Sequence, residues 1–194
     1  DLDPAYYGFS DADQETVFDT SNTFFGKKSM PLRELINALR ETYCGTLGAE
    51  YMYTSEQTEK RWWQEKLETI RSKPNFTADT KKRILDRLTA AEGLERYLHT
   101  KYVGQKRFSL EGGESFIAAM DALIQEAAKH GVQEVVMGMA HRGRLNVLVN
   151  TLHKLPADLF AEFDHTAPED LPAGDVKYHQ GFSSDVSTPS GPVH

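Results

Sequence analysis

The sequence predicts an α/β protein in which a helical region precedes the start of an α/β domain. Three observations support this fold class. Apolar residues recur at helical spacing between residues 29 and 102, the composition changes near residue 104, and a short apolar run then passes through a tight turn into another helix. The order of helix, strand, turn and helix is typical of α/β folds.

Residues 1–28 are predicted to form an extended or looped segment, because they contain few periodic apolar positions and many Asp, Ser, Thr and Gly residues. We expect the aromatic side chains of this segment to anchor it on the rest of the molecule. These side chains are Tyr6, Tyr7, Phe9, Phe18, Phe24 and Phe25.

Residues 29–103 are predicted to form a helical region. Its first helix starts at Pro31, a residue that suits the first helical turn, and stops at Gly45. Thr54 and Gln57 have the spacing of a capping box and introduce the second helix. The third helix is the longest of the region and ends near residue 102.

Within that third helix, Gly93 is expected to mark a break between two helices. Residues 104–194 are assigned to the α/β domain. A basic connection containing glycines leads into a helix with one apolar face, formed by Phe116, Ile117, Met120, Leu123, Ile124 and Ala127. A short helix is predicted from Pro156 to about Phe163.

The apolar run at residues 135–140 is short and ends in a turn, which favours a strand buried on both faces. A parallel sheet needs several strands to cover itself, and this run is the one convincing buried strand. The chain also opens without Met and stops at His194 with no element closing the fold. We therefore expect a fragment of a longer protein.

The composition is that of a globular protein, with 39% hydrophobic and 10% aromatic residues among 194. A formal net charge of -7 argues against a nucleic-acid-binding surface, which is usually basic. The single cysteine, Cys44, excludes an internal disulfide and fits a reducing compartment. There is no secretion signal and no apolar run of membrane-spanning length, so we expect neither nucleic-acid nor membrane partners.

The cluster His141-Arg142-Gly143-Arg144 stands between the predicted strand and the next helix. Ligands of open α/β sheets lie beyond the carboxyl ends of strands, and a helix N-terminus attracts anions. Basic side chains there oppose the helix dipole by about 0.3–1 kcal/mol each unless an anion is present. The cluster predicts an anion or carboxylate site; the alternative is a solvated helix start whose basic residues contact local carboxylates.

A second candidate site is the glycine-flanked loop with Tyr178 and His179, which also contains the hydroxyls of Ser183 and Ser184. A lone loop histidine is more often structural than functional. Residues 111–114, Glu-Gly-Gly-Glu, lack the Lys-Ser/Thr of a phosphate loop, so a connection that needs positive φ is favoured there. No spacing typical of metal ligands is present.

Five runs of the sequence resemble the thiamine-diphosphate-dependent first component of the 2-oxoglutarate dehydrogenase complex. They are Cys44-Gly45-Thr46-Leu47-Gly48-Ala49-Glu50-Tyr51-Met52, Ala90-Ala91-Glu92-Gly93-Leu94-Glu95, Lys106-Arg107-Phe108-Ser109-Leu110-Glu111-Gly112, Met139-Ala140-His141-Arg142-Gly143-Arg144-Leu145-Asn146-Val147-Leu148 and Gly174-Asp175-Val176-Lys177-Tyr178-His179. The resemblance covers essentially the whole chain. The family's subunit is several times longer, and this chain is similar to a piece of its N-terminal third.

The resemblance implies a helical region followed by an incomplete α/β domain of the thiamine-diphosphate-binding type, in a homodimer with the active site at its interface. The implied reaction is the oxidative decarboxylation of 2-oxoglutarate in the tricarboxylic acid cycle. In the family, the cofactor's ylide carbon attacks the keto carbon, CO2 leaves, and the succinyl group passes to a lipoyl group. Implied partners are the lipoyl-bearing succinyltransferase and the dihydrolipoyl dehydrogenase components, in the bacterial cytoplasm or the mitochondrial matrix.

The resemblance also implies residue roles. His141 is similar to the family's catalytic histidine near cofactor and substrate, and Arg142 resembles a residue that contacts thiamine diphosphate. His179 matches a histidine of substrate recognition, and Ser183 matches a hydroxyl that shapes the substrate pocket. These residue types suit the chemistry, because imidazole and guanidinium donate charge-assisted hydrogen bonds to carboxylates and oxyanions, and histidine transfers protons near neutral pH.

One departure from the family concerns the metal. The family's Gly-Asp…Asn segment, which holds Mg2+ and the diphosphate, has no counterpart here, because Gly174-Asp175 is followed by Val176-Lys177. We therefore expect the Mg2+ ligands to lie outside this chain and the chain alone to be inactive. Two alternatives stay open: a thiamine-dependent decarboxylase of another 2-oxo acid, such as 2-oxoadipate, and a non-catalytic scaffold or docking segment built on residues 29–102.

Overall fold

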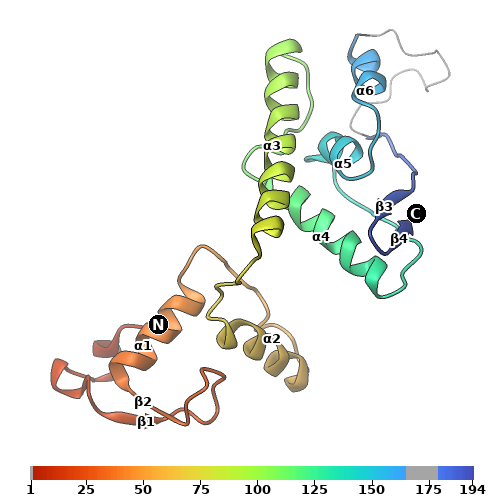
Figure 1. The fold of residues 1–194 in the computed structure, drawn as a ribbon. Helices are drawn as coiled ribbons and strands as arrows, with labels where there is room; N and C mark the ends of the chain where they lie inside the picture. Colours follow the sequence, from red (N-terminus) through yellow and green to blue (C-terminus); the bar gives the residue numbers. More distant parts are fainter. Residues whose placement is uncertain (1, 165–178) are drawn as a thin grey trace. The chain divides into compact units, whose positions relative to one another are not determined.

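The computed structural model describes residues 2–164 and 179–194 (Figure 1). Its elements are 3-10 helices at Pro4–Tyr7 and Asp11–Asp13, β1 (Val17–Asp19), β2 (Ser29–Pro31), α1 (Leu32–Tyr43), α2 (Gln57–Thr69), α3 (Ala78–Lys101), α4 (Ser115–Lys129), α5 (Arg144–Asn150), α6 (Pro156–Phe163), β3 (Val186–Thr188) and β4 (Gly191–Val193). The chain divides into two compact units, Asp1–Phe76 and Thr77–His194. In the described ranges, no helix has the length and apolar character needed to cross a membrane.

The first unit is organised around α1, which follows directly on β2. β1 and β2 pair antiparallel, with Val17 opposite Pro31 (Figure 1). Leu32, Ile36 and Ala38 form the buried face of α1. Because proline fixes φ and has no N–H to leave without a partner, Pro31 suits the step from strand to helix.

A buried carboxylate links three segments of the first unit. Glu68 on α2 is 7% exposed and accepts hydrogen bonds from the Phe24 backbone N–H and from the Tyr43 hydroxyl, both at 2.8 Å. The Tyr43 hydroxyl also lies 3.3 Å from that of Tyr51. Burial, followed by the hydrogen bonds with Tyr51 and Glu68, raises the pKa of Tyr43 well above its usual range. A charge at this depth is tolerated only when it is hydrogen-bonded, so these contacts fix α2 against α1.

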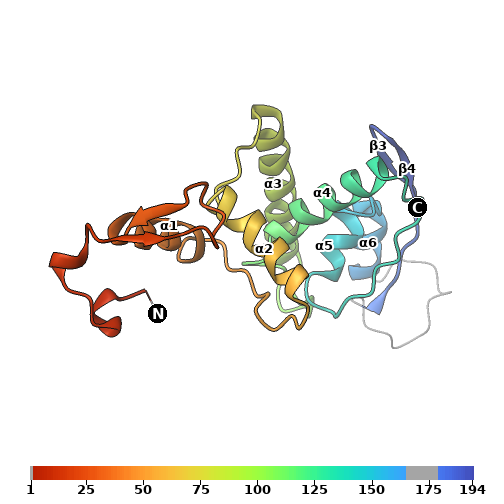
Figure 2. The same ribbon diagram turned by 90° about the horizontal axis from the view of Figure 1, so that it is seen from below.

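The second unit is built on α3, against which α4 and α5 pack (Figures 1 and 2). Its apolar residues form three clusters. The first contains Leu94, Leu98, Tyr102, Leu145, Leu159 and Phe163; the second contains Ala91, Leu110, Ile117 and Val147; and the third contains Ile124, Val186 and Val193. The first two clusters join α3 to α5, and the third places the β3–β4 hairpin on α4.

The predicted strand at residues 135–140 is wrong in two respects. The segment belongs to neither of the two sheets found among the described residues, and it is not buried on both faces. Val135, Met137 and Met139 pack against the apolar clusters, whereas Val136 between them is 96% exposed. This alternation is that of an extended chain with one buried face. An apolar run alone does not specify whether other segments pack against one face of the strand or against both.

The β3–β4 hairpin is absent from the sequence prediction. Its strands pair antiparallel, with Val186 opposite Val193. Just after β4, His194 N donates to Gln133 O at 2.9 Å, and Val135 N donates to His194 O at 2.7 Å. One residue that bonds to both neighbours of its opposite residue is the pattern of parallel strands. The extended segment therefore begins as a parallel neighbour of β4.

The helices agree closely with the sequence prediction, apart from the interior of α3 and the start of α2. The predicted break at Gly93 is wrong, since α3 runs through it without interruption. A glycine inside a helix costs about 1 kcal/mol, and the buried apolar residues around Gly93 outweigh this cost. The predicted capping box is also wrong: Glu56 precedes α2 and no side chain caps it, whereas Thr77 caps α3 by accepting from Thr80 N at 3.1 Å.

The aromatic anchoring predicted for residues 1–28 is wrong for Tyr6, which is 81% exposed. Tyr7 and Phe9 line a pocket together with Leu32 and Leu35 of α1. Phe9 and Phe18 also pack edge to face with ring centroids 5.6 Å apart. The helices and strands described above confirm the mixed helix-and-strand fold that the sequence predicts. The thiamine-diphosphate-type domain stays a prediction, as do the boundaries at residues 28 and 103.

Candidate functional site

The turn before α5 requires glycine at position 143. Gly143 has φ +76°, and a Cβ added there would lie 2.5 Å from Leu110 Cδ1. Its N–H donates to Phe108 O at 2.9 Å. Glycine adopts this φ without strain, and its lack of a side chain lets the loop around residues 108–110 touch the turn. The turn that carries the predicted anion site is therefore in contact with the loop around residues 108–110.

A buried polar cluster holds these two segments on α3. Glu95 is 3% exposed and accepts from Leu110 N at 3.0 Å and from Asn146 Nδ2 at 3.1 Å. It also pairs with the Arg107 guanidinium, whose side chain is 10% exposed. Asn146 Nδ2 donates further to Ala91 O at 2.9 Å. One carboxylate thus fixes the loop after α3 and the first turn of α5.

His141 lies at the exposed start of the turn, and its ring contacts that of Phe108 in a tilted arrangement, with ring centroids 4.0 Å apart and planes at 35°. Lys106 Nζ is 5.0 Å from the centre of the same Phe108 ring. Phe108 itself has φ +44°, a conformation that costs a non-glycine residue on the order of 1–3 kcal/mol. In this strained conformation the Phe108 ring contacts the His141 imidazole.

The Arg142 side chain binds two backbone carbonyl groups of the loop that precedes α4. Its Nε donates to Ser109 O at 3.3 Å and its Nη2 donates to Glu111 O at 2.7 Å. Backbone carbonyl dipoles, rather than local carboxylates, thus offset the opposition between this charge and the helix dipole. The alternative of a helix start paired with local carboxylates does not describe Arg142.

Arg144 connects the two predicted site segments. Its Nη1 donates to His179 O at 3.1 Å, and its Nη2 donates to Met139 O. The guanidinium therefore spans from the chain just before His141 to the backbone of His179. Arg144 Nε is buried and has no hydrogen-bond partner among the described residues. A buried N–H without an acceptor is costly, so this atom calls for an explanation.

The loop after residue 178 is anchored at two further points. Lys154 Nζ lies 2.8 Å from both Gln180 Oε1 and Glu162 Oε1, and the Ser184 hydroxyl donates to Leu152 O at 2.6 Å. These contacts attach the loop to the connection after α5. Tyr178, named with His179 in the sequence prediction, lies outside the described residues.

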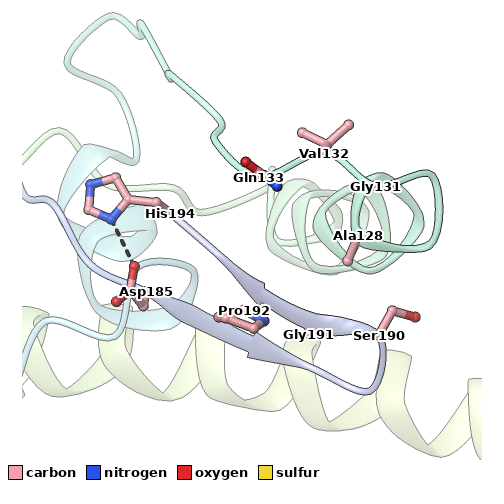
Figure 3. A pocket seen from close by; sticks show the side chains of 9 residues that line it. All are labelled: Ala128, Gly131, Val132, Gln133, Asp185, Ser190, Gly191, Pro192 and His194. Atoms are coloured by element: carbon pink, nitrogen blue, oxygen red, sulfur yellow. Dashed lines mark hydrogen bonds and ion pairs between the residues drawn. The ribbon is translucent and has the colours of Figure 1, made fainter.

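Ser183 points toward the β3–β4 hairpin. Its Oγ is 2.8 Å from His194 Nε2, and His194 Nδ1 is 2.8 Å from Asp185 Oδ1. His194 and Asp185 line an open pocket of about 480 Å³ between the end of α4 and the hairpin (Figure 3). The other lining residues are Ala128, Gly131, Val132, Gln133, Ser190, Gly191 and Pro192.

The structure thus brings the turn with His141 and the loop with His179 together through Arg144, while Ser183 faces His194. The roles predicted for His141, Arg142, His179 and Ser183 stay predictions. Sequence reasoning missed the linking function of Arg144 and the buried cluster. The signal was available, since Glu95, Arg107 and Asn146 all lie in runs that carry the family resemblance.

Comparison with known proteins gives close relatives along the whole chain. This chain is 77% identical to the 2-oxoglutarate dehydrogenase E1 component of Cupriavidus necator over 194 residues. It is 50% identical to the protein of the same name from Azotobacter vinelandii and 46% identical to that from Haemophilus influenzae. Each match covers 100% of this chain but only 20–21% of the relative. No family model matches the chain.

Proposed function

This chain matches the 2-oxoglutarate dehydrogenase E1 components along its whole length, and on that premise we propose that it supplies part of the substrate and cofactor site of such an enzyme. The proposed reaction is the decarboxylation of 2-oxoglutarate with transfer of the succinyl group to a lipoyl group. The observation that supports it best is the Arg144 guanidinium, which joins the backbone of Met139 to that of His179.

The arrangement suits a dianionic keto acid. 2-Oxoglutarate needs hydrogen-bond donors for two carboxylates, and the imidazoles of His141 and His179 come from the two segments that Arg144 links. Imidazole and guanidinium form charge-assisted hydrogen bonds with carboxylates, which are about twice as strong as neutral ones. We assign His179 and Ser183 to substrate binding and His141 to the reacting centre.

The residues present also fit the anionic part of thiamine diphosphate. The buried Arg144 Nε offers a donor without an acceptor among the described residues, and Arg142 adds a second guanidinium on the same turn. When bound, thiamine diphosphate supplies the nucleophilic carbon for decarboxylation of the keto acid. We propose that Arg142 contacts this cofactor. Among the described residues no group of three or more His, Cys, Asp or Glu side chains is placed to hold a metal ion, and we assign the Mg2+ ligands to other parts of the enzyme.

We further propose that the enzyme is a homodimer of the cytoplasm, or of the mitochondrial matrix, and works with a lipoyl-bearing succinyltransferase and a dihydrolipoyl dehydrogenase. The names of the relatives support the work with further components, because an E1 component is by name one part of a multi-component dehydrogenase.

The test is steady-state kinetics of the full-length enzyme that contains this chain. His179→Ala is expected to raise KM for 2-oxoglutarate about tenfold or more, because a hydrogen bond to a charged group contributes about 1.5–3 kcal/mol. His99→Ala is the matched control, since His99 is an exposed residue of α3 in the same unit. Unchanged kinetics in the His179 variant would refute the substrate role.

A further inference from the structure

Three side chains form a continuous hydrogen-bonded chain at the β3–β4 hairpin. His194 is at its centre, with Nε2 2.8 Å from Ser183 Oγ and Nδ1 2.8 Å from Asp185 Oδ1. Figure 3 shows the His194 imidazole turned toward Asp185 at one side of the pocket. The three groups follow in the order carboxylate, imidazole, hydroxyl, so the hydrogen bond from the imidazole determines how the Ser183 hydroxyl is oriented.

We propose that His194 and Asp185 are positioning residues that orient the Ser183 hydroxyl toward a carboxylate of the substrate. The inference rests on the proposed function, in which Ser183 binds the dicarboxylate. It adds two residues to which neither the sequence pattern nor the family resemblance gives a role. Both act through Ser183 rather than by touching the substrate.

The proton positions define how the chain works. A carboxylate only accepts, so Nδ1 of His194 carries a proton and donates to Asp185. In the neutral imidazole, Nε2 then accepts the Ser183 hydroxyl proton, and only oxygen lone pairs face outward. In the imidazolium, Nε2–H donates to Ser183 Oγ, and the hydroxyl proton is released to donate to a carboxylate. A dianionic substrate therefore favours the imidazolium form of His194, and Asp185 stabilises that charge.

The same order of groups occurs in serine hydrolases, where the carboxylate is buried. Here the Asp185 side chain is 73% exposed and that of His194 is 54% exposed. Orientation of a hydroxyl requires only the two hydrogen bonds, so the geometry favours the positioning role.

The test is a double-mutant cycle in the full-length enzyme, measuring KM for 2-oxoglutarate and kcat for Ser183→Ala, His194→Gln and the double variant. Each single variant is expected to raise KM about tenfold or more with kcat within about twofold, as for loss of one hydrogen bond to a charged group. The double variant is expected to match Ser183→Ala, because His194 acts only through that hydroxyl. Asp185→Asn is expected to give a smaller rise in KM.

The outcomes separate the two proposals. If Ser183→Ala leaves KM unchanged, the substrate role of Ser183 is wrong and the positioning role is lost with it. If Ser183→Ala raises KM but His194→Gln does not, or if the two effects multiply in the double variant, only the positioning role is overturned. Circular dichroism of each variant checks that the fold is retained.

Discussion

The Asn146 side-chain amide donates to the Glu95 carboxylate at 3.1 Å, inside a core where both residues are almost wholly excluded from water. This contact joins the middle of α3 to the first turn of α5. The turn with His141 starts three residues before α5. The buried pair of Glu95 and Asn146 therefore fixes the position of this turn relative to α3.

Glu95→Gln is expected to lower the free energy of unfolding of this chain by about 3 kcal/mol, because it leaves the buried Arg107 guanidinium with only the exposed Glu111 carboxylate, 3.6 Å away, as a charged partner. Urea unfolding followed by circular dichroism measures the change. Glu92→Gln is the matched control, since its ion pair with Arg96 on the same helix is solvent-exposed and is expected to contribute less than about 0.5 kcal/mol. Equal effects of the two substitutions would contradict the structural role of Glu95.

Gly143→Ala is expected to destabilise the second unit by about 1–3 kcal/mol, since it combines an unfavourable positive φ with a 2.5 Å contact to Leu110. Gly104→Ala separates the two causes, because Gly104 also has positive φ but open space around its Cβ position. Thermal unfolding of both variants is the measurement. A loss in Gly143→Ala no larger than that in Gly104→Ala would show that close approach of Leu110 does not matter.

Stability is expected to fall more steeply with alkaline pH in the wild type than in Tyr43→Phe. The pKa of Tyr43 is raised above its ordinary value of 10.0, first by burial, so the folded state keeps a proton that the unfolded state releases. The contribution is therefore fully present below pH 10 and is lost as pH rises toward the folded-state pKa. Urea midpoints of the two proteins between about pH 8 and 11 give the comparison. Parallel curves would exclude this linkage.

Titration of this chain alone with thiamine diphosphate and Mg2+ is expected to release little heat. Among the described residues no cluster of metal-ligating side chains is formed, and the sequence has no counterpart of the family's Mg2+-binding segment. Isothermal calorimetry checks this expectation, with the full-length enzyme as the positive control. Micromolar binding by the chain alone would place the metal ligands within these residues.

Helices were the most predictable part of this protein. The spacing of Leu32, Leu35, Ile36 and Leu39 reports a buried face directly, because a helix satisfies its backbone within itself. The segment at residues 135–140 was less predictable, since a strand is defined by a neighbour that local sequence does not specify. The β3–β4 hairpin was missed for a related reason: each of its strands has only three residues, too few to show a period.

The candidate site was predictable in its residue types and not in its connections. A basic cluster after an apolar run indicated anion binding, and the resemblance added His179 and Ser183. Neither source showed that Arg144 would span to the backbone of His179, because the two are 35 residues apart in sequence and meet only in the folded chain. The same holds for His194, whose relation to Ser183 depends on the hairpin.

The exposed Val136 and the two backbone hydrogen bonds that join His194 to Gln133 and Val135 have a practical consequence for handling this chain. Beyond its first bonds, the extended segment offers a row of backbone groups that a strand from another molecule can join, with an apolar side chain already outside. We therefore expect concentrated solutions of the isolated chain to self-associate, and a charged residue in place of Val136 would be the first remedy for precipitation.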